Sequence, residues 1–274
     1  MVHRVGSTPW AAPRRRAEVL RDRHDFATEA LTLYLALLEV WEQSWAAARS
    51  EQPASLAGWA GRHVLPDVVA ATAASGPERL ADSLLTGDLG AAEELLTAWL
   101  AGEELVPVER YLARATLRGP LAALGFGAAG TADPAPRGDG RCPHCGGQPQ
   151  LSFRSDTGDR LVSGRRRLQC ARCAASWSFS ASACAYCGET EGARRTVFAE
   201  RGKAPQVGRG ENGHATFPHL RVEACAGCRR YLIDVDLGRD PHAVPEVDEL
   251  AALPLDLYAA EQGFSKITPN LMGW

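Results

Sequence analysis

The chain contains eight cysteines, and each belongs to one of four Cys-x-x-Cys pairs: Cys142/Cys145, Cys170/Cys173, Cys184/Cys187 and Cys225/Cys228. Thiols at this spacing can form a redox centre, attach haem, form disulfides or bind a metal ion. Each of these uses requires different neighbouring residues, so the sequence that flanks the cysteines distinguishes between the four possibilities.

The residues around the pairs favour metal binding. Covalent haem requires His directly after the second cysteine, where this chain has Gly146, Ala174, Gly188 and Arg229. A thioredoxin-type redox motif requires a βαβ pattern, which surrounds none of the pairs. A tetrahedral ion takes four thiolates, and a two-residue spacer presents both sulfurs of a pair from one tight knuckle. We therefore predict two metal sites with four cysteine ligands each.

The four knuckles can be joined into two sites sequentially or in a nested order. Sequential pairing joins the first knuckle with the second and the third with the fourth, and places a β-hairpin inside each site, as in rubredoxin or a zinc ribbon. Nested pairing joins the first with the fourth and the second with the third. We favour sequential pairing, because strand-like runs separate the first two knuckles. Gly146 and Gly188 suit the positive φ that a knuckle often requires.

The ligand type leaves iron and zinc open, since tetrahedral thiolates suit both ions. A catalytic zinc keeps an open position and normally has three protein ligands, whereas each site here has four. We therefore expect structural sites or, at most, electron-transfer or sensing centres. The sequence shows no catalytic triad, phosphate-binding glycine loop or paired-acid motif, so we do not expect an enzyme.

The histidines are not expected to add ligands. His144 is predicted to be a solvent-facing spacer inside the first knuckle, and His24 and His63 are predicted to be isolated surface or cap residues. Three more lie in predicted loops without a carboxylate at a suggestive spacing: His214, His219 and His242.

Three arginines beside the second knuckle offer an alternative function. Arg165, Arg166 and Arg167 could contact phosphate while Trp177 stacks on a base, which would make the chain a zinc-ribbon nucleic-acid-binding protein. We favour a solvated strand face for these arginines. The formal net charge of −3 gives no general attraction to nucleic acid, which is not an expected partner.

The second half of the chain is predicted to position the cysteines on short strands. Six runs alternate or are rich in β-branched and aromatic residues: QPQLSFR, RRRLQCA, SWSFSA, TVFAE, HLRVEAC and RYLIDVDL. The tail VDELAALPLDLYAAEQGF returns to helical character, with Leu250, Leu253, Leu257 and Tyr258 as the expected packing face. The closing GFSKITPNLMGW either packs back onto the ribbons or contacts a partner.

The first half is predicted to be helical. One apolar stripe follows a long helix at near-helical spacing through Phe26, Ala30, Leu33, Leu37, Trp41 and Trp45, and is widened by Leu31, Leu35 and Leu38. Further helical patterns cover Glu78 to Leu85, Ala91 to Leu100 and Val108 to Leu117. Pro120 is expected to break or restart the chain before Leu121. Short connections indicate an all-α bundle.

These patterns predict an α+β protein. A stretch rich in Gly, Pro and Ala separates the halves. We predict a helical domain at 1–126, a linker at 127–141 and a tandem rubredoxin-like metal-binding domain at 142–274, divided into a first ribbon at 142–180, a second ribbon at 181–240 and a helical tail at 241–274.

The compartment is expected to be the cytoplasm. The N-terminus lacks the apolar core of a secretory signal. The longest apolar run, Ala30 to Trp41, contains Glu39 and is too short to span a bilayer, so no membrane insertion is expected. Structural disulfides are disfavoured in that reducing compartment.

The motifs together resemble the formate dehydrogenase accessory proteins of the FdhE type. The similarity runs through CPHCGGQP, LQCARCAASW, ACAYCGE and RVEACAGCRRYL to VDELAALPLDLYAAEQGFSK and TPNLMG, and includes RYLARATLRGPLAAL before the metal domain. Departures include SFSASAC, which lacks a basic residue that the family often carries before the third pair.

The resemblance implies a cytoplasmic maturation chaperone without a reaction of its own. Such proteins bind the catalytic subunit of a molybdenum- or tungsten-dependent formate dehydrogenase. They are similar to rubredoxin in holding iron through Cys-x-x-Cys pairs, so the resemblance implies that the eight cysteines are the ligands here.

Overall fold

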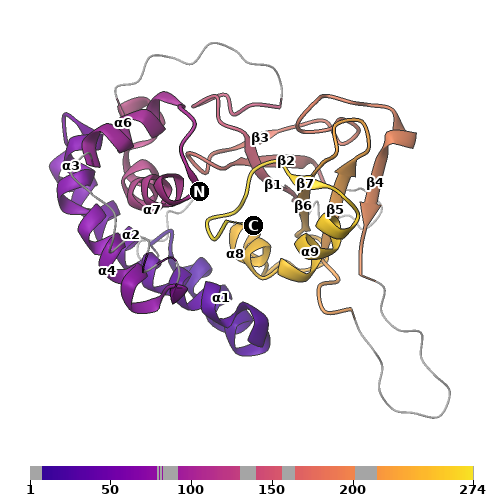
Figure 1. Ribbon diagram of the computed structural model, residues 1–274, viewed down its shortest axis with the longest axis horizontal. Coiled ribbons are helices and arrows are strands. Elements are labelled where there is room, and N and C mark those ends of the chain that lie inside the picture. Colours follow the sequence, from indigo (N-terminus) through magenta and orange to yellow (C-terminus); the bar gives the residue numbers. More distant parts are fainter. Residues whose placement is uncertain are drawn as a thin grey trace, which may run out of the picture.

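The computed structural model describes residues 8–78, 80, 82, 92–129, 140–155, 164–200 and 215–273. A layer of helices from the first half lies beside a β-sheet from the second half, and two short C-terminal helices lie between them (Figure 1). The predicted α+β class, with N-terminal helices followed by two cysteine-bearing β units and a helical tail, is confirmed.

The helical layer is built around one long central helix, α2. The bounds of the N-terminal helices are α1 Ala11–Arg23, η1 Asp25–Ala27, α2 Thr28–Glu51, α3 Leu56–His63, α4 Leu65–Ser75, α6 Ala92–Ala101, α7 Pro107–Leu124 and η2 Phe126–Ala129. Helix α2 confirms the predicted stripe, because Leu33, Leu37 and Trp41 are buried against neighbouring helices. Trp41 also donates from Nε1 to the carbonyl oxygen of Ala115 on α7 at 2.7 Å. Most of the pattern predicted at Glu78 to Leu85 lies outside the described residues.

The prediction of the apolar stripe is wrong at its first residue, Phe26. Phe26 lies in the 3-10 turn η1 before α2 and is 46% exposed. The turn interrupts the helical phase, so Phe26 leaves the core face and stacks against the His24 ring at a centroid distance of 5.4 Å.

The predicted break at Pro120 is also wrong, because α7 continues through this proline to Leu124. Proline removes only one backbone donor, and buried packing of the turn offsets that loss. Gly119 lies so close to α2 that a Cβ there would be 2.6 Å from the carbonyl oxygen of Trp41. The close approach of α2 and α7 therefore holds this turn helical.

One sheet joins both cysteine-bearing units. Its strands are β1 Pro149–Arg154, β2 Arg166–Cys170, β3 Ser176–Ser178, β4 Arg195–Phe198, β5 Leu220–Cys225, β6 Arg230–Asp236 and β7 Ser265–Lys266, with the 3-10 turn η3 Gly192–Arg194 before β4. Each of the six predicted runs overlaps one of these strands, and only β4 begins before its run, at Arg195. The order is β3-β2-β1-β6-β5-β4, with β7 beside β6. The parallel pairing of β1 with β6 connects the two antiparallel units.

The C-terminal helices α8 Pro245–Leu250 and α9 Leu253–Glu261 confirm the helical tail, but its predicted packing face is partly wrong. Leu257 is 57% and Tyr258 42% exposed, whereas Leu255 and Ala259 are buried. The predicted face assumed one continuous helix. Because the helix is broken between α8 and α9, the residues before and after the break do not keep the spacing of a single helix. After α9 the chain packs back, with Phe264 buried and Met272 against the core; Trp274 lies outside the described residues.

None of the helices in the described ranges combines the length and apolar character that a membrane crossing would need.

Candidate metal centres

The eight thiols gather into two groups of four. Cys142, Cys145, Cys170 and Cys173 form the first centre, and Cys184, Cys187, Cys225 and Cys228 form the second; within each centre all ligand atoms lie within 4.8 Å of one another. The structure therefore brings the knuckles together sequentially, with β1 and β2 between those of the first centre and β4 and β5 between those of the second.

The sulfur separations fit a tetrahedral ion. In the first centre the Sγ atoms of Cys142 and Cys173 are 3.6 Å apart and those of Cys145 and Cys170 are 3.4 Å apart. In the second centre the corresponding Sγ distances are 3.8 Å for Cys184 and Cys228 and 3.9 Å for Cys187 and Cys225. A tetrahedral ion with metal–sulfur bonds of about 2.3 Å holds its sulfurs about 3.8 Å apart. The donor set and its geometry thus suit one thiolate-bound ion in each centre.

All four knuckles share one backbone conformation. The residue after each second cysteine has positive φ: Gly146 67°, Ala174 56°, Gly188 75° and Arg229 58°. In each case its N–H donates to the carbonyl oxygen of the first cysteine, at distances from 2.8 to 3.1 Å. The positive φ expected of Gly146 and Gly188 is confirmed. At Ala174 and Arg229 the only sequence signal for a positive φ is the position directly after the second cysteine, because neither residue type favours this conformation.

The first centre is enclosed by the helical layer and the sheet. Cys142, Cys145 and Cys170 are buried and Cys173 is half-buried. Arg172 donates from its backbone N–H to Cys170 Sγ at 3.3 Å and from Nη1 to the Cys145 carbonyl oxygen at 3.0 Å. Its guanidinium lies 5.3 Å from the ring centre of Trp99 on α6. Hydrogen bonds from the neighbouring thiols and from the His144 backbone lower the pKa of Cys142.

Two arginines of α7 lie beside the first centre. Burial lowers the pKa of Arg114 to about 10, against the attraction of Glu249 and Cys170. Arg114 hydrogen-bonds to Gln150 on β1 and donates to the Pro269 carbonyl oxygen at 2.9 Å. Arg118 pairs with Glu246 on α8 at 2.6 Å; burial opposes its charge, but attraction to Glu246 and, to a lesser extent, to Cys173 raises its pKa overall. These cations are placed to offset the negative charge of a four-thiolate centre.

The second centre lies nearer the surface. Cys187 is exposed and Cys228 half-buried, whereas three ligands of the first centre are buried. Burial opposes ionisation of Cys225, but backbone N–H groups of Cys228 and Gly227 lower its pKa overall. The two centres therefore share a ligand set but differ in access to solvent.

A third polar cluster was missed by the sequence prediction. His219 was expected to lack a carboxylate partner, yet its Nε2 lies 2.7 Å from Asp248 Oδ1, and Asp240 completes the group. Arg16 of α1 also enters the cluster and pairs with both carboxylates. Because its guanidinium already supplies the positive charge, this cluster joins α1 to the C-terminal helices and is not a candidate metal site. No sequence spacing linked residues so far apart.

The remaining histidines follow their predictions in part. His144 and His63 are exposed, as expected. His24 caps α1 but is buried rather than on the surface, because its ring packs 4.9 Å from that of Phe217. Burial, with Arg23 and Arg16 nearby, lowers the pKa of His24. His242 is exposed and His214 lies outside the described residues.

The predicted solvated arginine face is wrong for Arg166. Only 3% of Arg166 is exposed, and its guanidinium pairs with Glu223 at 2.5 Å and donates to the carbonyl oxygens of Ser180 and Ala183 at 3.0 Å each. Arg165 is exposed and Arg167 half-buried. Arg166 is buried because the loop carrying the third knuckle folds over β2, so the three arginines do not form one phosphate-binding row.

Comparisons with known proteins agree with the predicted resemblance. A family model described as "FdhE, C-terminal domain" matches residues 183–272, which include the whole second centre. The "Protein FdhE homolog" of Aquifex aeolicus is 32% identical over 133 residues, which is 48% of this chain and 41% of the relative. That of Pseudomonas putida is 34% identical over 132 residues, 48% of this chain and 38% of the relative. The matched region thus spans less than half the length of each of these relatives.

The fold comparison covers nearly the whole chain. The crystal structure of the FdhE protein from Pseudomonas aeruginosa aligns with a TM-score of 0.62 over 96% of this chain and 95% of that chain. The sequence identity is 22%, so this likeness establishes the fold alone. Together with the matches to relatives, it confirms the resemblance to the FdhE family.

Proposed function

We propose that this chain, which carries an FdhE C-terminal domain and has the fold of an FdhE protein, is a maturation factor for a formate dehydrogenase. It binds the catalytic subunit of a molybdenum- or tungsten-dependent enzyme in the cytoplasm before that subunit is assembled. The family match over residues 183–272 carries this proposal, because it includes the second centre with all four of its cysteines.

The arrangement of groups supports binding rather than catalysis. In the described part of the chain, side chains of metal-ligating type gather in the two four-cysteine centres and in the cluster of His219, Asp240 and Asp248, which Arg16 already occupies. Each four-cysteine centre has a complete ligand set, with no position left for a substrate. A rigid, metal-stabilised sheet beside a helical layer offers a surface on which another protein can dock.

The eight cysteines would each bind a metal through Sγ, and one iron or zinc ion would occupy each centre. Either ion would supply folding energy by crosslinking two knuckles, because the unfolded chain has no preformed site. Elemental analysis of protein purified without oxygen should find two equivalents of one of these metals. One equivalent or none would contradict the assignment of eight ligands.

The function is tested by affinity purification from the native cytoplasm, without oxygen and after nuclease treatment. We expect mass spectrometry to identify a formate dehydrogenase catalytic subunit that is enriched over a tag-only control. A reconstituted mixture of the two purified proteins should then give a complex by size-exclusion chromatography. Failure of both would contradict the maturation function. Recovery of nucleic-acid-associated proteins that disappear after nuclease treatment would favour the zinc-ribbon alternative.

A further inference from the structure

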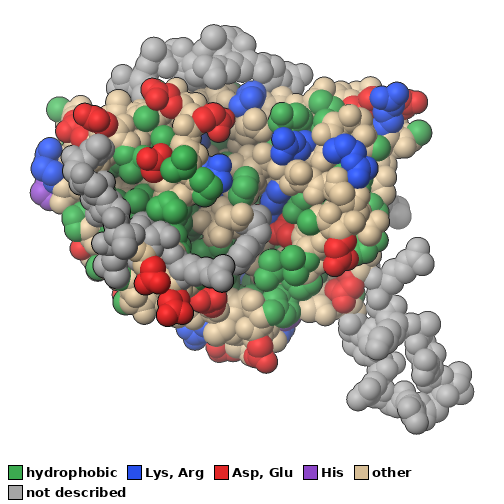
Figure 2. Space-filling model, in the orientation of Figure 1, with side chains coloured by type: hydrophobic (Ala, Val, Ile, Leu, Met, Phe, Trp, Pro, Cys, Tyr) green, Lys and Arg blue, Asp and Glu red, His purple; other side chains and the backbone are tan. Residues whose placement is uncertain are grey.

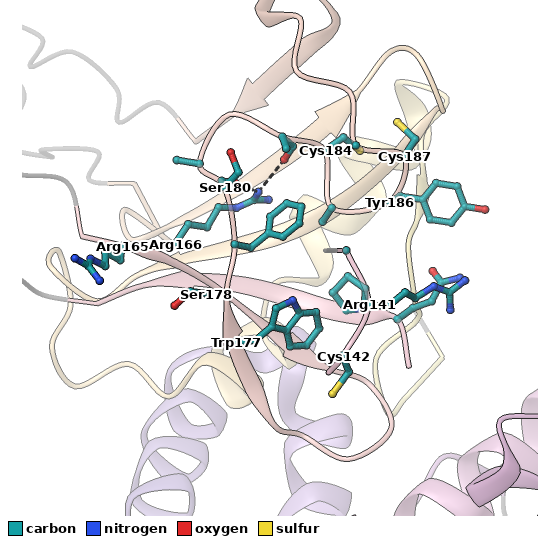
Figure 3. Close-up of a pocket in the computed structure, with 18 of the residues that line it drawn as sticks. Arg141, Cys142, Arg165, Arg166, Trp177, Ser178, Ser180, Cys184, Tyr186 and Cys187 are labelled. Atoms are coloured by element: carbon teal, nitrogen blue, oxygen red, sulfur yellow. Dashed lines mark hydrogen bonds between the residues drawn. The ribbon is translucent and has the colours of Figure 1, made fainter. Parts of the chain in front are cut away.

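A cleft of about 1440 Å³ lies between the two metal centres. Its lining includes Cys142 of the first centre and Cys184 and Cys187 of the second, with strands β1 to β3 contributing residues of the sheet. Arg165 lies toward one end, Arg141 and Tyr186 lie toward the other, and Trp177 lies between them (Figure 3). The cleft is larger than the 300–1,000 Å³ typical of small-molecule pockets, so its size suits a segment of polypeptide.

The charges in the cleft are positive. Its lining contains four arginines and no aspartate or glutamate among the described residues. Two of them already have carboxylate partners inside the fold, since Arg154 pairs with Glu223 at 2.6 Å and Arg166 pairs with the same carboxylate at 2.5 Å. Arg141 and Arg165 have no carboxylate partner in the described ranges, so they remain available to an acidic ligand.

The wider surface has the same bias. On the face shown in Figure 2, basic side chains gather over the upper part of the half formed by the sheet, while acidic side chains are more frequent over the helices and along the lower edge. A negatively charged segment would therefore be attracted to the sheet half of the molecule, although the chain as a whole has a net charge of −3.

The cleft also offers apolar contacts. Tyr186, in the third knuckle, is 46% exposed, and Arg230 lies 5.4 Å from its ring centre. Trp177 and Phe179 are half-buried and pack against the small cluster of Leu168, Ala185 and Leu232. Partly exposed aromatic rings are typical anchors for apolar side chains at protein interfaces.

We propose that this cleft binds an extended acidic segment of the partner protein, with an apolar side chain against Tyr186 and Trp177 and carboxylates at Arg141 and Arg165. This proposal rests on the proposed function, because the segment would belong to the formate dehydrogenase catalytic subunit. Since both centres line the cleft, loss of a metal would reshape it and weaken binding.

A peptide fits the described residues better than a nucleic acid. A phosphate backbone carries a charge on every nucleotide and is usually bound by a row of cations. Here two of the four arginines are committed to Glu223, and the other two lie at opposite ends of the cleft. Two separated cations with the Trp177 ring between them match a peptide whose acidic residues flank an apolar one.

The test uses the full chain with its metals and immobilised overlapping peptides that together cover the sequence of the catalytic subunit. At least one acidic peptide with an apolar residue is expected to bind. Reversing both charges, with Arg141→Glu and Arg165→Glu, should weaken that peptide and the intact subunit by about tenfold. Tyr186→Ser should weaken both ligands as well. Arg62→Glu reverses an exposed charge on α3 and should leave binding unchanged.

The outcomes separate the two proposals. Metal content equal to that of the unmodified chain shows that a variant is folded. If folded cleft variants bind the intact subunit as well as the Arg62→Glu control does, the cleft proposal is wrong and the maturation function stands. If the unmodified chain does not bind the subunit at all, both fail. Tighter binding of a poly(dT) oligonucleotide than of any peptide, lost in the same variants, would overturn the peptide assignment.

Discussion

Arg16 of the first helix donates from Nε to both carboxylate oxygens of Asp248 on α8, at distances of 3.1 and 3.0 Å, across 232 residues of sequence. Both side chains are buried, and the Asp248 carboxylate also accepts the Val244 N–H at 2.8 Å. Because this pair connects the helical layer with the C-terminal helices that pack on the sheet, the two halves of the chain are expected to unfold together.

Removal of either Arg16 or Asp248 should therefore destabilise the folded protein. Asp248→Asn is expected to lower the free energy of unfolding by about 2 kcal/mol, because it leaves the buried Arg16 with only the less buried Asp240 as its counter-charge. Urea unfolding of both proteins with bound metal measures the difference. The exposed neighbouring pair of Arg21 and Asp22 provides the control, since Arg21→Ala should cost less than about 0.5 kcal/mol. Equal effects of the two substitutions would show that the buried pair does not hold the halves together.

Acid sensitivity should arise in part at Glu246. Burial raises the pKa of this carboxyl, but Arg118 and hydrogen bonds from Tyr34, Arg118 and Gln169 lower it below its ordinary value overall. The folded state therefore keeps Glu246 ionised where the unfolded chain would already be protonated. Its contribution to stability is present above the ordinary glutamate pKa of about 4.3 and is lost as the pH falls through the lower folded value.

The comparison of Glu246→Gln with the unmodified chain isolates this contribution. We expect the variant to be less stable by about 2 kcal/mol at neutral pH, since Arg118 loses its partner, and the difference to shrink as the pH falls below about 4. Urea midpoints measured across this range give the result. A difference that stays constant with pH would show that Glu246 has an ordinary pKa in the folded protein.

The cysteine knuckles could be predicted from sequence because their determinants are local. Two cysteines, a two-residue spacer and a following glycine specify the conformation found at Gly146 and Gly188. The parallel pairing of β1 with β6, in which Leu151 lies opposite Ile233, has no such local signal. The contacts of Arg16 and Arg166 are equally non-local, since each depends on a carboxylate that the fold brings from a distant segment. The prediction at Pro120 was wrong because tertiary packing outweighed local propensity, and the prediction at Leu257 was wrong because the helix is broken between α8 and α9.

The two centres should release metal at different rates. Cys187 of the second centre is exposed, whereas three ligands of the first centre are buried beneath the helical layer. A chelator added to the native protein should therefore remove one equivalent faster than the other, because access of a competing ligand limits exchange. Cys187→Ser should remove the fast phase and Cys142→Ser the slow phase. A single rate for both equivalents in the unmodified chain would contradict this asymmetry.

Cys170 should be the most damaging cysteine to replace in the first centre. It ends β2, pairs with Pro149 of β1, accepts the Arg172 N–H and is buried. Cys170→Ser is expected to lose one metal equivalent and much of the soluble yield, because the ion crosslinks the β1–β2 hairpin. Cys187→Ser is the matched control at an exposed ligand and should lose one equivalent with a smaller loss of yield. Full metal content and normal solubility of Cys170→Ser would defeat the two-centre assignment.

Arg166 provides a test of whether the arginine run stabilises the fold or contacts a partner. Arg166→Gln should lower the free energy of unfolding by about 2 kcal/mol, since it removes one of the cations that surround the buried Glu223 carboxylate, while Arg154 and Arg195 remain. Arg165→Gln, at the exposed neighbouring position, should change stability by less than about 0.5 kcal/mol. Thermal unfolding of the two variants distinguishes the roles. If Arg166→Gln were as stable as Arg165→Gln, the ion pair with Glu223 would not stabilise the sheet, and Arg166 would be available for a ligand.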